Sequence, residues 1–152
     1  MHTLDTARTA QEAFDLCLHE MLNLQPERAA VLYGYDADDL LIARSAQGLN
    51  KDEIFQPGQL SLKILQEVIN AGQAKILYDA SSEEGYGERM STILSGIRSV
   101  MCCPVVDASG TSVGLLYADS RVQVSAFKNA QLSQVLDLAQ RLQAKLTKLG
   151  RA

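Results

Sequence analysis

Residues 96–121, GIRSVMCCPVVDASGTSVGLLYADSR, constrain the fold of this chain more than any other stretch. They contain two apolar segments joined by the short polar turn Asp107-Ala108-Ser109-Gly110. Glycine at the end of such a turn adopts a backbone conformation that costs other residues more. The pattern therefore predicts an antiparallel β-hairpin. It contains no obvious set of catalytic residues.

Further strands and a helix are predicted before this hairpin. Residues 28–35 and 40–46 have the composition of two strands, and the residues between them have that of a turn. Ser61 is a plausible helix N-cap, and the apolar pattern that follows it ends at Gly72, a typical helix stop. Residues 75–78 then form a short apolar segment, which predicts another strand.

Both ends of the chain have helical periodicity. Near the N-terminus, apolar residues recur in alternating steps of three and four, at Ala7, Ala10, Phe14, Cys17, Met21 and Leu24. The same spacing follows near the C-terminus, at Leu132, Val135, Ala139, Leu142, Leu146 and Leu149. Leu136 and Leu138 add a second apolar face, so we expect five residues of this seam to form a homodimer interface: Leu132, Val135, Ala139, Leu142 and Leu146. Packing within the domain is the alternative.

Composition places the chain among ordinary globular domains. Its 152 residues, 47% hydrophobic, suit a single domain with a helical N-terminus (5–25), a core (28–121) and a C-terminal helix (126–149). No apolar run approaches the ~20 residues that span a bilayer, and residues 1–14 lack the pattern of a signal peptide. We therefore expect a cytoplasmic protein that does not bind membranes.

Charge and cysteine content exclude other classes. The net charge is −4 and no basic stripe is visible, so we expect no nucleic-acid partner. Three cysteines, Cys17, Cys102 and Cys103, do not make a disulfide framework. With only two histidines there is no zinc spacing, and we expect no metal and no cofactor.

Three stretches, SLKILQEVINAGQAKILYDA at 61–80, SGIRSVMCCPV at 95–105 and SVGLLYADSR at 112–121, resemble the GAF domain family. The resemblance covers roughly residues 28–142. It is closest to GAF domains attached to adenylate cyclases, phosphatases and enhancer-binding transcriptional activators. It implies a small-molecule-sensing regulatory domain, without catalysis, that acts on an effector domain in a larger signalling protein.

The element order predicts an α+β fold, and the resemblance implies the GAF-like, PAS-related version of it. A central antiparallel sheet of about five to six strands would carry the terminal helices on one face. On the other face, helices and a lid loop at 79–95 would cover a ligand pocket. Dimerisation through the terminal helices is also implied.

We expect the ligand to meet two groups of residues. In the loop, Asp79, Tyr86 and Met90 are candidates; Asp79 could equally cap a turn, and Tyr86 could fold onto the nearest apolar surface. On the strand that follows, Ser99 and Met101 share one face, and we expect that face to line the pocket.

Arg98 could clamp a carboxylate or phosphate of the ligand. It could instead lie at the surface or pair with an acidic residue, and surface placement is the commoner outcome for arginine.

Two functional subfamilies fit less well. Cyclic-nucleotide-binding GAF domains carry an Asn-Lys, Phe, Asp-Glu pattern; the matching positions here are Asp119-Ser120, Phe127 and Gln131-Leu132, and only the Phe is kept. Free methionine sulfoxide reductases carry cysteines around the pocket lid, whereas residues 79–95 contain none.

Two alternatives to a sensor remain. One is a dimerisation scaffold whose pocket is filled by its own side chains. The other is a thiol-dependent redox enzyme that uses Cys102 and Cys103. These adjacent residues should point to opposite faces of one strand and behave as buried hydrophobes.

Overall fold

The computed structural model describes residues 3–35, 37, 39–56, 59–60, 62–78, 97–123 and 126–150. Its helical elements are η1 (Leu4–Thr6), α1 (Ala10–Leu22), η2 (Lys51–Glu53), α2 (Leu62–Ala71) and α4 (Asn129–Lys148). Its strands are β1 (Arg28–Tyr35), β2 (Leu41–Gln47), β3 (Lys75–Leu77), β4 (Ser99–Val106) and β5 (Ser112–Ser120). None of the helices in these described ranges is long and apolar enough to cross a membrane.

The strands form one five-stranded antiparallel sheet in the order β2-β1-β5-β4-β3. The two predicted hairpins, β1–β2 and β4–β5, are confirmed, and so is the α+β fold class. Strand β5 is central and pairs with β1 from Arg28 opposite Asp119 to Tyr33 opposite Gly114. This pairing brings the start of the first strand beside the end of the last one.

The turn between β4 and β5 forms for the reason that its composition indicates. One carboxylate oxygen of Asp107 accepts hydrogen bonds from the backbone N–H groups of Ser109 (2.9 Å) and Thr111 (3.0 Å). Gly110 has a φ of +85°, in the left-handed region that favours glycine. Hydrogen bonding to the charged form, from Ser109 first, also lowers the pKa of Asp107.

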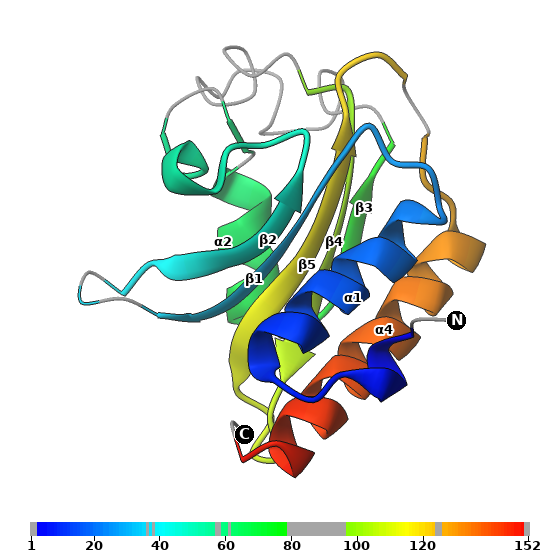
Figure 1. Cartoon of the computed structure of the whole chain (residues 1–152). Helices are drawn as coiled ribbons and strands as arrows, with labels where there is room; N and C mark the ends of the chain where they lie inside the picture. The colour runs from blue at the N-terminus through cyan, green and yellow to red at the C-terminus, as the bar shows by residue number, and fades with distance from the viewer. Residues whose placement is uncertain are drawn as a thin grey trace.

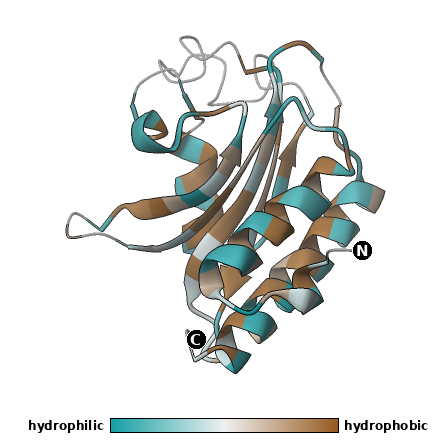
Figure 2. Cartoon of the chain, in the orientation of Figure 1, coloured by the Kyte–Doolittle hydropathy of each residue, from teal (hydrophilic) through white to brown (hydrophobic). Residues whose placement is uncertain are grey.

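Helices cover both faces of the sheet. Figure 1 shows α1 and α4 side by side on one face and α2 on the other. Two buried clusters result. We call the cluster between the sheet and the terminal helices α1 and α4 the helical-face core; it includes Met101 and Cys103. We call the cluster between the sheet and α2 the α2-face core; it includes Val100 and Cys102. In Figure 2 the strands are largely hydrophobic, whereas α1 and α4 also carry hydrophilic stretches.

The centre of the sheet contains a close backbone approach. A Cβ atom added at Gly114 would lie 2.5 Å from the carbonyl oxygen of Leu32 and 2.9 Å from the ring of Tyr33. Real Cβ atoms do not come so near to a backbone oxygen. Glycine at this position of the SVGLLYADSR stretch therefore lets β1 and β5 pair without distortion.

The N-terminal helix is shorter than its apolar stripe. Helix α1 begins at Ala10 because the hydroxyl of Thr9 caps it, accepting from the N–H of Glu12 at 3.1 Å. Ala7 lies before the cap and is nevertheless buried in the helical-face core. The expectation of one helix over 5–25 is therefore wrong at its start, where η1 and an extended turn precede α1.

The edge formed by β3 is short. Strand β3 pairs with β4 only from Lys75 opposite Cys102 to Leu77 opposite Val100. Beyond Cys102, β4 continues through Pro104 to Val106 and pairs with β5 alone. One side of this last part of β4 has no strand partner among the described residues.

Candidate functional site

A buried ion pair joins the two central strands. Nε and Nη2 of Arg28 donate to the two carboxylate oxygens of Asp119 at 2.7 and 2.6 Å. Arg28 is 3% exposed and Asp119 is fully buried. Two parallel hydrogen bonds of this kind fix the plane of the guanidinium as well as its position. Strand pairing sets this geometry, because Arg28 and Asp119 lie directly opposite each other.

Two further groups complete the cluster, which we call the Arg28 cluster (Arg28, Gln59, Tyr117 and Asp119). The hydroxyl of Tyr117 donates to the carboxylate of Asp119 at 2.5 Å. Nη2 of Arg28 donates to the backbone carbonyl of Gln59 at 2.7 Å. Tyr117 belongs to the α2-face core, so the cluster lies on the α2 side of the sheet.

Burial and pairing act against each other in this cluster. Burial opposes the charge of Arg28, but the hydrogen bonds and charge of Asp119 outweigh it and raise the pKa of Arg28. Burial raises the pKa of Asp119, and the hydrogen bonds from Arg28 and Tyr117 offset part of that rise. The guanidinium therefore stays protonated, with Asp119 as its counter-ion.

The cluster lies where three strands begin or end. Arg28 opens β1, Asp119 is the second-last residue of β5, and Val100 opposite Asp119 is the second residue of β4. Residues 78–98 connect β3 to this end of β4. Sequence reasoning missed the Arg28 cluster. The sequence did contain a signal for it. Arg28 stands at the start of one apolar strand and Asp119 near the end of another, and these two strands pair.

Three of the predicted ligand residues fall outside the described residues. Asp79, Tyr86 and Met90 all lie in 79–96, and their predictions stay predictions. Arg98 is described: its side chain is exposed and its backbone N–H donates to the carbonyl of Ser120 at 2.8 Å.

The expectation that Ser99 and Met101 face a pocket on the α2 side is wrong. Met101 is 1% exposed and packs in the helical-face core with α1 and α4. Ser99 shares its side of the strand, and its hydroxyl donates to the carbonyl of Gln123 at 2.8 Å. The sequence correctly predicted that neighbouring side chains of this strand point to opposite faces, but not which set points to which face. Both faces of the strand are covered, so the residues on both are apolar and hydrophobicity does not distinguish them.

The cysteines lie where strand alternation predicts. Cys102 faces the α2-face core and Cys103 the helical-face core, and both are fully buried, as is Cys17 on α1. Burial raises the pKa of Cys17 and of Cys103 to about 12, and that of Cys102 further still. The thiols described here are protonated at neutral pH. No group of three or more metal-ligating side chains occurs among the described residues.

The predicted dimer seam packs mainly inside the domain. Val135, Leu142 and Leu146 are fully buried and Ala139 is 4% exposed, all in the helical-face core. Of the five predicted interface residues, only Leu132 is partly exposed. Leu136, which was assigned to the second apolar face, is 38% exposed.

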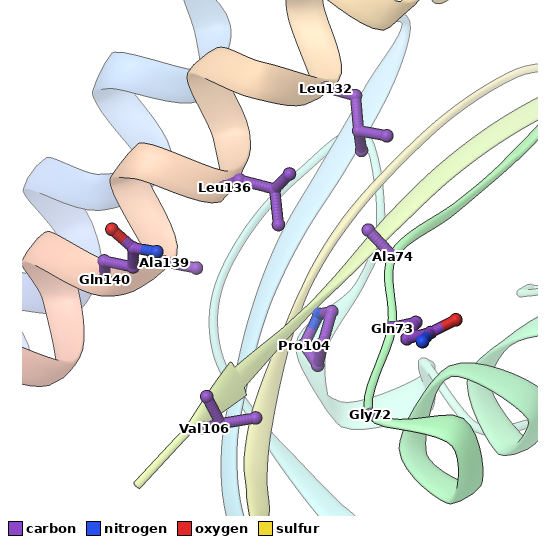
Figure 3. Close-up of a pocket in the computed structure, with 9 residues that line it drawn as sticks. All are labelled: Gly72, Gln73, Ala74, Pro104, Val106, Leu132, Leu136, Ala139 and Gln140. Carbon is purple, nitrogen blue, oxygen red and sulfur yellow. The ribbon is translucent and has the colours of Figure 1, made fainter. Parts of the chain in front are cut away.

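An apolar groove of about 400 Å³ runs beside this outer face of α4 (Figure 3). We call it the α4 groove. Leu132 and Leu136 extend from α4 on one side of it, and Pro104 and Val106 of β4 form its floor. Gly72, Gln73 and Ala74, which connect α2 to β3, form the opposite side.

Comparison with known proteins identifies the architecture. The family model for the GAF domain matches residues 8–146. A comparison with curated proteins finds no match. Solved structures do match over nearly the whole chain. The GAF domain of the cyanobacteriochrome TePixJ has 16% sequence identity and a TM-score of 0.73, and the match covers 99% of this chain and 97% of that one.

Two other matches carry different descriptions. A domain of a putative two-component sensor histidine kinase from Sinorhizobium meliloti 1021 has 15% identity and a TM-score of 0.71, with 95% and 94% of the two chains covered. A type II free methionine-R-sulfoxide reductase from Thermoplasma acidophilum has 14% identity and a TM-score of 0.67, with 92% and 94% covered. Identities this low show a shared fold and leave the activity open.

Proposed function

This chain belongs to the GAF domain family, and on that premise we propose that it is a non-catalytic, small-molecule-sensing regulatory domain of a signal transduction protein. Solved neighbours from a sensor kinase and a cyanobacteriochrome support a role in signalling. We further propose a cytoplasmic location and an effector domain elsewhere in the same protein.

The Arg28 cluster is the observation that carries the sensing role. Nε and Nη2 of Arg28 are used by Asp119 and Gln59, and no group in the described ranges accepts a hydrogen bond from Nη1. A buried donor without an acceptor is costly, and a ligand oxygen would satisfy it. We therefore propose that the ligand binds on the α2 face beside Arg28, with a carbonyl or carboxylate oxygen on Nη1. The predicted loop residues Asp79, Tyr86 and Met90 would complete the site.

Ligand binding would be transmitted through the sheet. Strands β4 and β5 contribute side chains to both cores, so a shift of either strand on the α2 face also shifts the surface on which α1 and α4 pack. Only a difference in ligand affinity between two arrangements of the chain can drive such a change.

We propose that the domain acts as a homodimer and that the exposed side of α4 forms the interface. Leu132 and Leu136, beside the α4 groove, are the leucines of α4 that are not buried. The proposed interface lies on α4, the helix that the sequence indicated, but on a different face of it. The face that carries the predicted seam packs against the sheet.

A thermal-shift screen against a metabolite library tests the sensing role. We expect at least one class of oxygen-bearing metabolites to raise the Tm. Arg28→Lys keeps the positive charge but loses the paired hydrogen bonds, and it should weaken that stabilisation by at least about ten-fold in apparent Kd, because one hydrogen bond to a charged group contributes roughly 1.5–3 kcal/mol. Arg141→Lys is the matched control, since Arg141 forms an ion pair with Glu20 on the helical face. An empty screen, or hits that Arg28→Lys leaves unchanged, would contradict the proposal.

The thiol-dependent reductase is the competing function, since one solved neighbour has that activity. The buried, protonated state of Cys102 and Cys103 opposes it. Methionine sulfoxide reduction that is lost on Cys102→Ala or Cys103→Ala would support the enzyme and overturn the non-catalytic proposal.

A further inference from the structure

A second, smaller cavity lies on the α2 face at the far end of β1 from Arg28. Its volume is about 260 Å³. Residues from the β1–β2 hairpin, from the segment after η2 and from α2 line it: Tyr35, Asp39, Leu40, Leu41, Phe55, Leu62, Leu65, Gln66 and Ile69. Tyr35 is at the opposite end of β1 from Arg28, roughly 23 Å away at ~3.3 Å per residue. The cavity is therefore separate from the Arg28 cluster.

We propose that this cavity binds a small primary amine with an aromatic or branched apolar body. The inference goes beyond the sensing role proposed above and does not depend on it. Three properties of the cavity carry it: its size, its apolar walls and a rim carboxylate, that of Asp39, for which the described residues provide no partner.

The walls favour a compact apolar group. Leu41 and Leu65 are buried, while Phe55, Leu62 and Ile69 are partly buried against the α2-face core. The volume is below the roughly 300–1,000 Å³ of pockets for drug-sized ligands, so one ring or one branched chain would fill the cavity.

Tyr35 forms a fixed aromatic part of the rim. Its side chain is 44% exposed, and its hydroxyl donates to the backbone carbonyl of Ser112 at 3.0 Å. The ring is therefore held in place while one side of it stays accessible. An accessible aromatic face attracts both apolar groups and cations.

Both polar side chains of the rim, Asp39 and Gln66, can accept hydrogen bonds, and Asp39 carries a negative charge. Asp39 is exposed, and no ion pair or hydrogen bond to its carboxylate occurs within the part of the chain that the structure describes. Gln66 is also exposed and adds an amide oxygen. An ammonium group is therefore favoured here and a carboxylate is repelled.

The backbone conformation of Asp39 allows its charge to be removed by substitution without a change in the turn. Its φ is +60°, in the left-handed region that asparagine and aspartate tolerate better than other side chains. Asp39→Asn therefore removes the charge while it preserves the turn and the shape of the rim.

Titration of the ¹⁵N-labelled chain with three matched probes tests the proposal: phenethylamine, 2-phenylethanol and 3-phenylpropanoate. We expect phenethylamine to shift the amide signals of Leu40, Phe55 and Gln66. Its Kd should be about five-fold lower than that of 2-phenylethanol, as expected for an exposed charge pair, and 3-phenylpropanoate should bind most weakly. Raising the salt concentration should reduce the preference for the amine.

Two variants separate the cavity from other acidic surfaces. Asp39→Asn should abolish the preference for phenethylamine and leave the Kd of 2-phenylethanol unchanged. Asp5→Asn, the same change at an exposed residue of η1, should retain the preference. Shifts confined to other residues, or a preference for the amine that survives Asp39→Asn, would overturn the proposal.

Discussion

Arg28 and Asp119 are 91 residues apart in the sequence, yet the guanidinium of one donates to both carboxylate oxygens of the other in the interior of the sheet. The pair therefore links β1 to β5 and places two opposite charges side by side on the α2 face. A single partner left alone in this environment would be an unpaired buried charge, which is strongly unfavourable.

Asp119→Asn and Arg28→Met should each lower the free energy of unfolding by about 3–5 kcal/mol, because each leaves a buried charge or its hydrogen-bonding groups without a partner. Urea denaturation measures the change. In the double variant Arg28→Met/Asp119→Leu the loss should be much smaller than the sum of the single losses. Additive losses would show that the two side chains do not interact.

Gly114→Ala should destabilise the domain by at least about 3 kcal/mol, the upper end of the cost of overpacking, since the added Cβ meets the carbonyl oxygen of Leu32. Gly72→Ala is the comparison. A Cβ there has no neighbour within 4 Å, and only its φ of +66° is unfavourable, which should cost about 1–2 kcal/mol. Equal losses in denaturant titrations would contradict the close approach of β1 and β5.

The thiols should be unreactive in the folded chain. Cys17, Cys102 and Cys103 should resist a disulfide-exchange reagent such as DTNB at pH 8 and react fully in denaturant, because burial keeps them protonated. Fast labelling of any one of them without denaturant would contradict this placement.

Stability should also fall at alkaline pH. The folded chain holds the proton of Cys17 up to a pKa of about 12, whereas the unfolded chain releases it near the ordinary value of 9.0. The stabilisation is therefore complete below pH 9.0 and is lost as the pH rises from there towards 12. Cys17→Ala should flatten the decline in unfolding free energy between pH 8 and pH 10.5 relative to the unmodified chain, and an unchanged slope would contradict the assignment.

Two leucines of α4 should separate folding from dimerisation. Leu136→Asp should leave the circular dichroism spectrum unchanged and shift sedimentation from dimer to monomer, because Leu136 is 38% exposed beside the α4 groove. Leu142→Asp should instead unfold the domain, since Leu142 is fully buried. A dimer that persists in Leu136→Asp would exclude the proposed interface.

Much of the fold could be predicted from the sequence because its signals are local. Strand β1 was predicted with its observed bounds, and α2 ends where expected, at the residue before Gly72. Gly72 has a φ of +66°, and its N–H donates to the carbonyl of Val68 at 2.9 Å. The start of α1 was mistaken because the apolar stripe continues past the cap, into residues that are buried without being helical.

The candidate site was harder to predict because it depends on pairing between distant segments. Nothing near Arg28 in the sequence indicates that Asp119 lies opposite it. The choice between the faces of β4 failed for a related reason: Val100, Met101, Cys102 and Cys103 are all buried, so hydrophobicity does not distinguish the two sides. The position of the terminal helices relative to the sheet decides which residues face the ligand side.

The short β3 strand also bears on the solubility of the domain. It leaves the last part of β4 without a strand partner among the described residues on one side, and unpaired edges can recruit strands from other molecules and begin aggregation. Pro104 lies in this part of β4 and has no N–H to donate to an incoming strand. A proline in the CCPVV segment thus protects an edge that no strand covers in the part of the chain that the structure describes, and Pro104→Val would make that edge a better template for intermolecular pairing.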